Sequence, residues 1–312
     1  MQHPKYLSFA GGGTYGFLYI GFYRALSAHL PAAAGLTVTE FFNGIEGFAG
    51  VSIGALAALA FSLNLSMEKY EALFERNMNM SDLMPQHDFA QMLQVYGLDR
   101  GDALKRMISD VLKSAGISDS ATFEDLKRLL KRDFACVATN LNTSAPQIFS
   151  ARETPEVCIR DAVYMSMAVP FLFVPLQYKG DTMSDGGLTQ HMPNVFDEDE
   201  TLFVDLSFYD TRLPTTTIQD FCVACLSARE SNRWYLKKRC LVLQTPSDIC
   251  THPCDFQIQE QLALRVQCGY NSTVAFLYPR VIEALHTTLR LMYALCLEGR
   301  RREEAADAVE TC

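Results

Sequence analysis

The chain has 312 residues, of which 49% are hydrophobic and 20% are charged, enough to build one large α/β domain or two smaller ones. Its formal net charge of −9 and lack of a long basic patch argue against nucleic-acid binding through phosphate contacts. The N-terminus lacks the apolar core of a secretory signal, and nowhere do 18 apolar residues run unbroken. We therefore expect an intracellular, cytoplasmic protein.

The first 31 residues have the pattern of a strand, a turn and a helix. Residues 6–10 have the character of a strand, and the glycine-rich sequence Gly-Gly-Gly-Thr-Tyr-Gly follows at 11–16. Apolar residues then recur at helical spacing over 17–30, and we expect Pro31 to end the helix. The helix N-terminus would direct backbone N–H groups toward whatever occupies the glycine turn.

Two functions are compatible with this turn. Gly11, Gly13 and Gly16 match the Gly-x-Gly-x-x-Gly fingerprint of dinucleotide sites, and Glu40 lies near the distance expected of a ribose-binding acid. The same backbone N–H groups could instead stabilise an oxyanion. A nucleophile further along the chain would favour the oxyanion hole.

Residues 50–54, Gly-Val-Ser-Ile-Gly, supply a candidate nucleophile. Ser52 lies between Gly50 and Gly54 and precedes an alanine-rich run typical of a helix, the pattern of a sharp strand-to-helix turn that exposes the serine hydroxyl. The positive end of the helix dipole would favour negative charge developing at this position.

The next stretch, about 66–133, is predicted to be a helical insertion, and one interpretation makes it a cap over the serine. Apolar residues at three-and-four spacing predict helices over 67–80, 89–96, 101–115 and 123–132. Strands are predicted at 134–140 and 147–151, and a helix at 157–167.

A candidate base follows at Asp185, which precedes Gly186 and Gly187. Such a sequence is often only a turn. If Asp185 reaches Ser52, however, it can accept the hydroxyl proton while N–H groups of the glycine turn stabilise the oxyanion. An unperturbed aspartate, with a pKa of about 3.9, is a weak base at neutral pH, so the site must hold it close to the hydroxyl.

Together these motifs resemble the patatin-like phospholipase family, which pairs a glycine-rich oxyanion motif with a Gly-x-Ser-x-Gly nucleophile and an Asp-Gly-Gly motif. Residues 138–143 and 162–175 and the spacing from Asp185 to Pro193 are similar as well, so the resemblance covers about 6–195. It implies that Gly11, Gly12 and Gly13 form the oxyanion hole, Ser52 is the nucleophile and Asp185 the base. It also implies a mechanism without histidine, calcium or a cofactor.

Two residues depart from the family pattern. Tyr15 stands where many relatives carry arginine or lysine, so any role of that cation at a lipid phosphate is missing at this position. His191 stands where relatives commonly have asparagine. We interpret His191 as a structural substitute that holds the Asp185 loop, with a histidine relay as the alternative.

Beyond residue 200 the sequence predicts helices and strands but no catalytic residues. Strands are expected at 201–206 and 240–243, helices at 218–228, 256–269 and 280–297, and a flexible tail at 299–312. The apolar 280–297 helix could pack on the sheet or face a membrane. We expect most of the ten cysteines to be reduced, and the pairs Cys222/Cys225 and Cys250/Cys254 are weak zinc candidates.

The predicted architecture is a single domain over 1–298, a three-layer α/β/α sandwich around a mainly parallel sheet. The predicted function is hydrolysis of lipid carboxylic esters through a Ser52–Asp185 dyad and an acyl-enzyme, at a membrane surface with peripheral association and without metal, cofactor or nucleic acid. The alternatives are a dinucleotide-dependent oxidoreductase and an inactive lipid-binding module.

Overall fold

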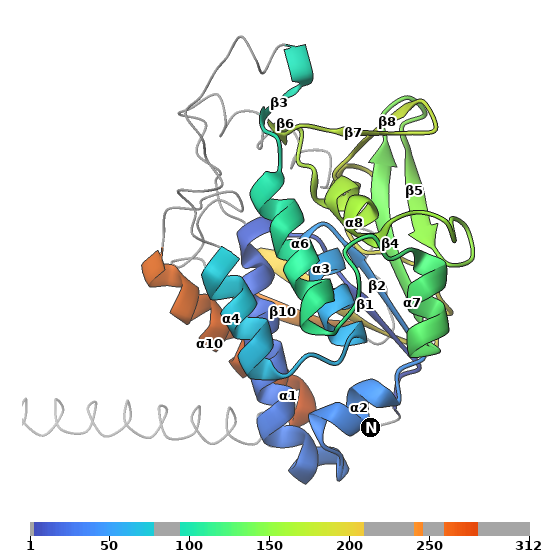
Figure 1. Cartoon of the computed structure of the whole chain (residues 1–312). Coiled ribbons are helices and arrows are strands. Elements are labelled where there is room, and N and C mark those ends of the chain that lie inside the picture. The colour runs from blue at the N-terminus through green and yellow to red at the C-terminus, as the bar shows by residue number, and fades with distance from the viewer. Residues whose placement is uncertain (1–2, 78–93, 209–239, 246–258, 280–312) are drawn as a thin grey trace, which may run out of the picture.

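The computed structural model describes residues 3–77, 94–208, 240–245 and 259–279 (Figure 1). Its centre is an eight-stranded sheet of order β10-β9-β1-β2-β4-β8-β7, in which β5 also pairs with β4. The five strands from β10 to β4 are parallel, and β5, β7 and β8 add antiparallel pairs. The predicted α/β fold with a mainly parallel sheet is thus confirmed.

The strands of this sheet are β1 Tyr6–Phe9, β2 Gly47–Val51, β4 Asp133–Asn140, β5 Ala145–Ser150, β7 Leu176–Tyr178, β8 Asp181–Ser184, β9 Thr201–Phe208 and β10 Cys240–Thr245. A second, parallel pair is formed by β3 Gly97–Asp99 and β6 Phe171–Phe173. The α-helices are α1 Leu18–Ala34, α2 Val38–Asn43, α3 Ile53–Ser62, α4 Met67–Asn77, α6 Asp102–Ser114, α7 Phe123–Leu130, α8 Ile159–Met167 and α10 Gln259–Leu277. Two 3₁₀ turns, η1 Gly13–Phe17 and η3 Gly186–Leu188, complete the described elements.

The core lies between the sheet and the helices that cover one of its faces. Leu7, Phe48 and Phe134 are register neighbours on β1, β2 and β4, and all three are buried. Further along β1, the ring of Phe9 packs edge-on against Phe22 of α1 and lies 5.3 Å from the ring of Phe61 of α3. Aromatic contacts of this kind fix both helices against the strand that leads into the glycine turn.

Helix α1 corrects one prediction, because it does not end at Pro31. Pro31 lies inside the helix, which continues to Ala34 and ends where Gly35 adopts a left-handed conformation with φ 69°. The N–H group of Gly35 donates to the carbonyl of Pro31 at 3.1 Å. The missing N–H of a proline removes one hydrogen bond, which a last helical turn with this glycine cap tolerates.

The predicted helical insertion contains α4, α6 and α7, but it also contributes a strand. Helix α6 packs against α4, α8 and α3, the helix that follows Ser52. Strand β3, within this stretch, pairs with β6 just after α8. The predicted helix at 218–228, that at 280–297, the tail and most of 89–96 lie outside the described residues. Helix α10 extends to Leu277, beyond the predicted end at residue 269.

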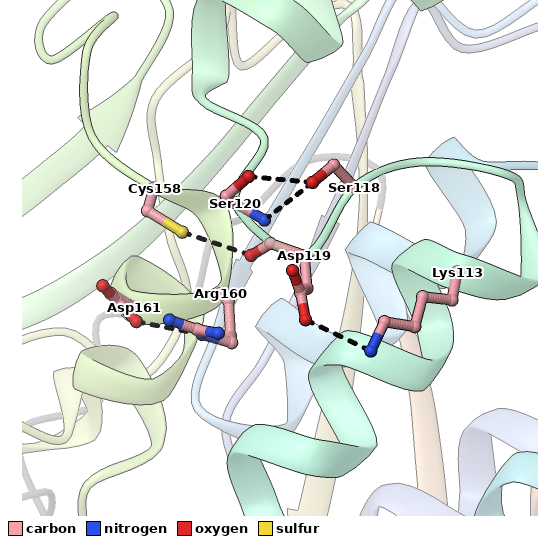
Figure 2. A network of polar contacts seen from close by, with 7 residues as sticks. All are labelled: Lys113, Ser118, Asp119, Ser120, Cys158, Arg160 and Asp161. Atoms are coloured by element: carbon pink, nitrogen blue, oxygen red, sulfur yellow. Dashed lines mark hydrogen bonds and ion pairs between the residues drawn. The ribbon is translucent and has the colours of Figure 1, made fainter.

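A polar network joins the segment between α6 and α7 to the start of α8 (Figure 2). Lys113 of α6 forms an ion pair of 3.1 Å with Asp119, and the Cys158 thiol donates to the Asp119 carbonyl at 3.4 Å. The N–H of Ile159 donates to the carbonyl of Ala121 at 3.0 Å. These contacts fix the N-terminus of α8, whose other end reaches the candidate active site.

Among the helices described, none is both long and apolar enough to cross a membrane.

Candidate active site

Ser52 occupies the sharp turn between β2 and α3. Its backbone has φ 53° and ψ −129°, an unfavourable conformation for a residue with a side chain, typical of a nucleophile held at a strained strand-to-helix turn. A methyl group on Gly54 would overlap the carbonyl oxygens of Phe9 and Ala10, and one on Gly50 would overlap the backbone of Gly54. Gly54 therefore lets α3 begin directly against the end of β1, and Gly50 leaves room for the first turn of α3 beside β2.

Asp185 lies directly against this serine, although 133 residues separate them in sequence. The Ser52 hydroxyl donates to Asp185 Oδ2 at 2.6 Å, and both residues are buried. The other carboxylate oxygen, Oδ1, accepts the N–H of Gly187 at 2.8 Å. The backbone N–H of Asp185 donates to the carbonyl of Ala168 at 2.9 Å, just beyond α8. One carboxylate oxygen is thus held by the backbone, and the other faces the serine.

Ser166, which the sequence analysis did not select as a site residue, supports the Ser52 turn. Its hydroxyl oxygen accepts the N–H of Ser52 at 2.9 Å, and its own proton goes to the carbonyl of Val137 on β4 at 2.6 Å. The side chain is fully buried. The sequence offered one signal for Ser166, which is that it lies in the segment 162–175 that resembles the family. The sequence did not indicate which groups its hydroxyl would bond.

The glycine turn lies beside Ser52, the candidate nucleophile. A Cβ atom on Gly11 would lie 3.4 Å from Cβ of Ser52. The Gly11 N–H already donates to the carbonyl of His191 at 3.0 Å, whereas no hydrogen bond to another described residue uses the N–H groups of Gly12 and Gly13. Gly13 begins η1 and has φ 55°, which favours glycine. Gly12 and Gly13 are therefore the candidate oxyanion donors, together with Ile53, whose N–H opens α3.

His191 takes part in this turn through its backbone and in a neighbouring pair through its ring. Its Nε2 atom is 2.9 Å from Oδ1 of Asp205 on β9, and both side chains are largely buried. Its carbonyl accepts the N–H of Gly11. This arrangement supports the structural interpretation of His191 rather than the relay.

Glu40, the candidate ribose-binding acid, is used instead to cap a helix. Its carboxylate accepts the N–H and the hydroxyl of Thr37, both at 2.8 Å, while the Thr37 hydroxyl accepts the N–H of Glu40. This is the reciprocal capping box at the start of α2. Glu40 therefore stabilises local structure, which argues against the dinucleotide site.

The described ranges contain no group of three or more His, Cys, Asp or Glu side chains arranged to hold a metal ion. Cys222/Cys225 and Cys250/Cys254, the weak zinc candidates, lie outside those ranges.

Comparison with known proteins gives a family match over the part of the chain that carries this site. A model described as "Patatin-like phospholipase" matches residues 7–194. The uncharacterized protein R571 of Acanthamoeba polyphaga mimivirus is 26% identical over 287 residues, covering 86% of this chain and 92% of its own. The "Probable lipid hydrolase 463L" of Invertebrate iridescent virus 6 is 24% identical over 208 residues, covering 62% and 70%.

Among solved structures, VipD from Legionella pneumophila is similar in fold. The two align with a TM-score of 0.55 and 20% sequence identity, over 88% of this chain and 67% of VipD. The alignment extends well beyond residue 194, so the likeness in fold includes part of the C-terminal region that the family model does not match.

Proposed function

Because the chain belongs to the patatin-like phospholipase family, we propose that it is a lipid acyl hydrolase in which Ser52 is the nucleophile and Asp185 the base. The observation that carries this proposal is the 2.6 Å hydrogen bond from the Ser52 hydroxyl to Asp185 Oδ2 in a buried site. A serine positioned against its proton acceptor is the arrangement that nucleophilic catalysis needs.

The reaction proceeds in two halves. Asp185 accepts the Ser52 proton as Oγ attacks the ester carbonyl, and the tetrahedral oxyanion receives hydrogen bonds from the N–H groups of Gly12 and Gly13. The intermediate collapses, the alkoxide leaves with the proton from Asp185, and an acyl-enzyme remains. Asp185 then takes a proton from water, whose oxygen attacks the acyl group, and returns it to Ser52 as the fatty acid is released.

The substrate class follows from the family and from the reaction. We propose lipid carboxylic esters presented at a membrane surface, to which the protein binds peripherally, with no metal or cofactor in the reaction. The name "Probable lipid hydrolase" carried by the iridescent virus relative agrees with this class.

A serine-directed fluorophosphonate probe tests the proposal. We expect labelling at Ser52, located by mass spectrometry of the tryptic peptide, together with hydrolysis of a short-chain nitrophenyl ester. Ser52→Ala should abolish both, and Ser62→Ala, a buried serine at the end of the same helix, should change neither.

The other outcomes identify the alternatives. Binding to lipid vesicles with neither labelling nor turnover would favour an inactive lipid-binding module. Saturable NADH fluorescence that is lost on changing Gly13, with no esterase activity, would favour the dinucleotide site.

A further inference from the structure

Arg265 of α10 is a buried cation that contacts the glycine turn from a distant part of the sequence. Only 1% of its surface is exposed. Its guanidinium Cζ lies 4.4 Å from the centroid of the Tyr15 ring, and its Nη1 donates to the Thr14 hydroxyl at 2.6 Å, across 251 residues of sequence. Thr14 and Tyr15 both belong to η1, which begins at the candidate oxyanion donor Gly13.

Placing a guanidinium in this environment is costly, because a charge loses its hydration when it is buried. A charge-assisted hydrogen bond and a cation–π contact offset part of that cost, and both are made to η1. An apolar side chain would fill the same volume without the desolvation penalty. The position of this charge therefore points to a role beyond packing.

Helices α10 and α1 cross closely (Figure 1). Helix α10, which carries Arg265, also contacts η1. A methyl group on Gly21 of α1 would overlap the backbone of Val266, and one on Gly269 of α10 would overlap the carbonyl of Leu18. The absence of side chains at Gly21 and Gly269 lets the two helix backbones touch. Arg265 lies one helical turn before Gly269, which directs it toward η1 at the start of α1.

The contacts continue from η1 to the donor N–H groups. The N–H of Tyr15 donates to the carbonyl of Gly12 at 3.1 Å. That carbonyl and the N–H of Gly13 belong to the same planar peptide unit, so fixing the direction of the carbonyl also fixes the direction of the N–H. Arg265 contacts the side chains of Thr14 and Tyr15, and the backbone of Tyr15 in turn bonds the peptide that carries the Gly13 N–H.

We propose that Arg265 is a positioning residue for the oxyanion hole, which fixes the Gly12–Gly13 peptide through Thr14 and Tyr15 and adds a buried positive charge to the turn. This inference rests on the proposed hydrolase function. Arg265 lies outside residues 7–194, the part of the chain that matches the family. In this protein helix α10, the last helix that the structure describes, therefore completes a site whose reacting groups come from the family region.

The test compares variants of the full chain on a soluble nitrophenyl ester, with the melting temperature and the rate of fluorophosphonate labelling measured on the same samples. Arg265→Met removes the charge and the hydrogen bond at similar length, and Arg265→Lys keeps the charge. Thr14→Val removes the acceptor and leaves Arg265 in place. Gln267→Met, on an exposed position of the same helix, is the matched control.

We expect Arg265→Met to lower kcat and the labelling rate roughly ten- to hundredfold, because the donor N–H groups are misplaced. KM should stay within about twofold, since the ground-state substrate does not depend on these donors. Arg265→Lys should recover part of the loss, and Gln267→Met should match the wild type. If Arg265 had a purely structural role, Arg265→Met would lower the melting temperature but would not lower kcat while leaving KM nearly unchanged.

A folded Arg265→Met protein with wild-type kcat and labelling would overturn the inference. If that variant does not fold, Thr14→Val decides: a several-fold lower kcat supports the positioning role, and an unchanged kcat in a folded protein refutes it. These results are distinguishable from failure of the proposed function itself, in which the wild type would neither label nor hydrolyse ester and the inference would fall with it.

Discussion

The hydroxyl of Ser166 accepts the backbone N–H of Ser52 at 2.9 Å, so a residue of α8 supports the strained turn that carries the proposed nucleophile. The same hydroxyl donates to Val137 of β4, which links the turn to the sheet. A residue with positive φ and a side chain persists only where its surroundings compensate the conformational cost. Ser166 supplies part of that compensation.

Ser166→Ala is expected to reduce both stability and turnover. It leaves a buried N–H and a buried carbonyl without this partner, which should cost about 1–3 kcal/mol of unfolding free energy. The relaxed turn should also lower kcat by roughly ten- to a hundredfold. Urea denaturation and ester hydrolysis measure the two effects. The matched control is Ser62→Ala, which removes another buried serine hydroxyl, bonded to Leu59, and should leave kcat unchanged.

Asp185→Asn should lower kcat by roughly a hundred- to ten-thousandfold, because the amide keeps the size of the side chain but cannot accept the Ser52 proton. Asp181→Asn, on β8 just before Asp185, is the control, since that carboxylate accepts a hydrogen bond from Asn140 and has no part in the proposed chemistry. Steady-state kinetics with a soluble ester give the comparison. Equal activities of the two variants would exclude Asp185 as the base.

His191→Asn should retain substantial activity, because the backbone carbonyl that holds Gly11 is unchanged and the ring bonds Asp205. The pH dependence of kcat is the second measurement. An aspartate base does not require the inflection near 6.5 that an unperturbed histidine would give. If His191→Asn were as inactive as Asp185→Asn, with such an inflection in the wild type, a histidine relay would replace the dyad.

Gly13→Ala tests the oxyanion donors. A side chain is strained at φ 55°, and the displaced N–H should reduce kcat by on the order of a hundredfold. Gly35→Ala is matched to it, because Gly35 also has positive φ, caps α1 and has open space where a Cβ would be built. Both variants should lose about 1 kcal/mol of stability. Only Gly13→Ala should lose activity, and equal kcat values would remove Gly13 from the oxyanion hole.

Asp99 gives a prediction about the pH dependence of stability. Burial raises the pKa of its carboxyl above 3.8, although the N–H of Gly101 donates to it and acts in the opposite direction. The folded state therefore holds this proton more tightly than the unfolded state. As the pH rises from the pKa of the unfolded state through the higher pKa of the folded state, the contribution of Asp99 to stability falls. Asp99→Asn should be more favourable, relative to wild type, at pH 7 than at pH 4. Urea denaturation at both pH values measures the difference, and the reverse trend would contradict the assignment.

Local patterns were sufficient to predict the backbone elements that carry the candidate site. The strand at 6–9, the glycine turn and the Ser52 turn each depend on a few adjacent residues, whose conformational preferences are visible in sequence. The family resemblance implied the pairing of Ser52 with Asp185, which spacing alone could not establish. The error at Pro31 arose because the prediction did not weigh the Gly35 cap four residues later.

Contacts between distant segments could not be predicted in the same way. Ser166 hydrogen-bonds Ser52 across 114 residues, and Arg265 reaches Thr14 across 251. Neither contact has a local signature, because each depends on how α8 and α10 pack in the folded chain. Glu40 illustrates the opposite case. Its spacing from the glycines suggested that it binds a ribose, but its hydrogen bonds with Thr37, only three residues away, make it part of a helix cap.

The position of β1 within the sheet has a consequence for synthesis. This strand, at residues 6–9, leaves the ribosome long before one of its two neighbours, β9, at residues 201–208. Until β9 emerges, one edge of β1 stays open to pairing with other chains. Pairing between strands so far apart in sequence slows folding and extends the period in which a nascent chain can aggregate. We therefore expect fragments that end before residue 201 to be recovered mainly as aggregates or in complex with chaperones.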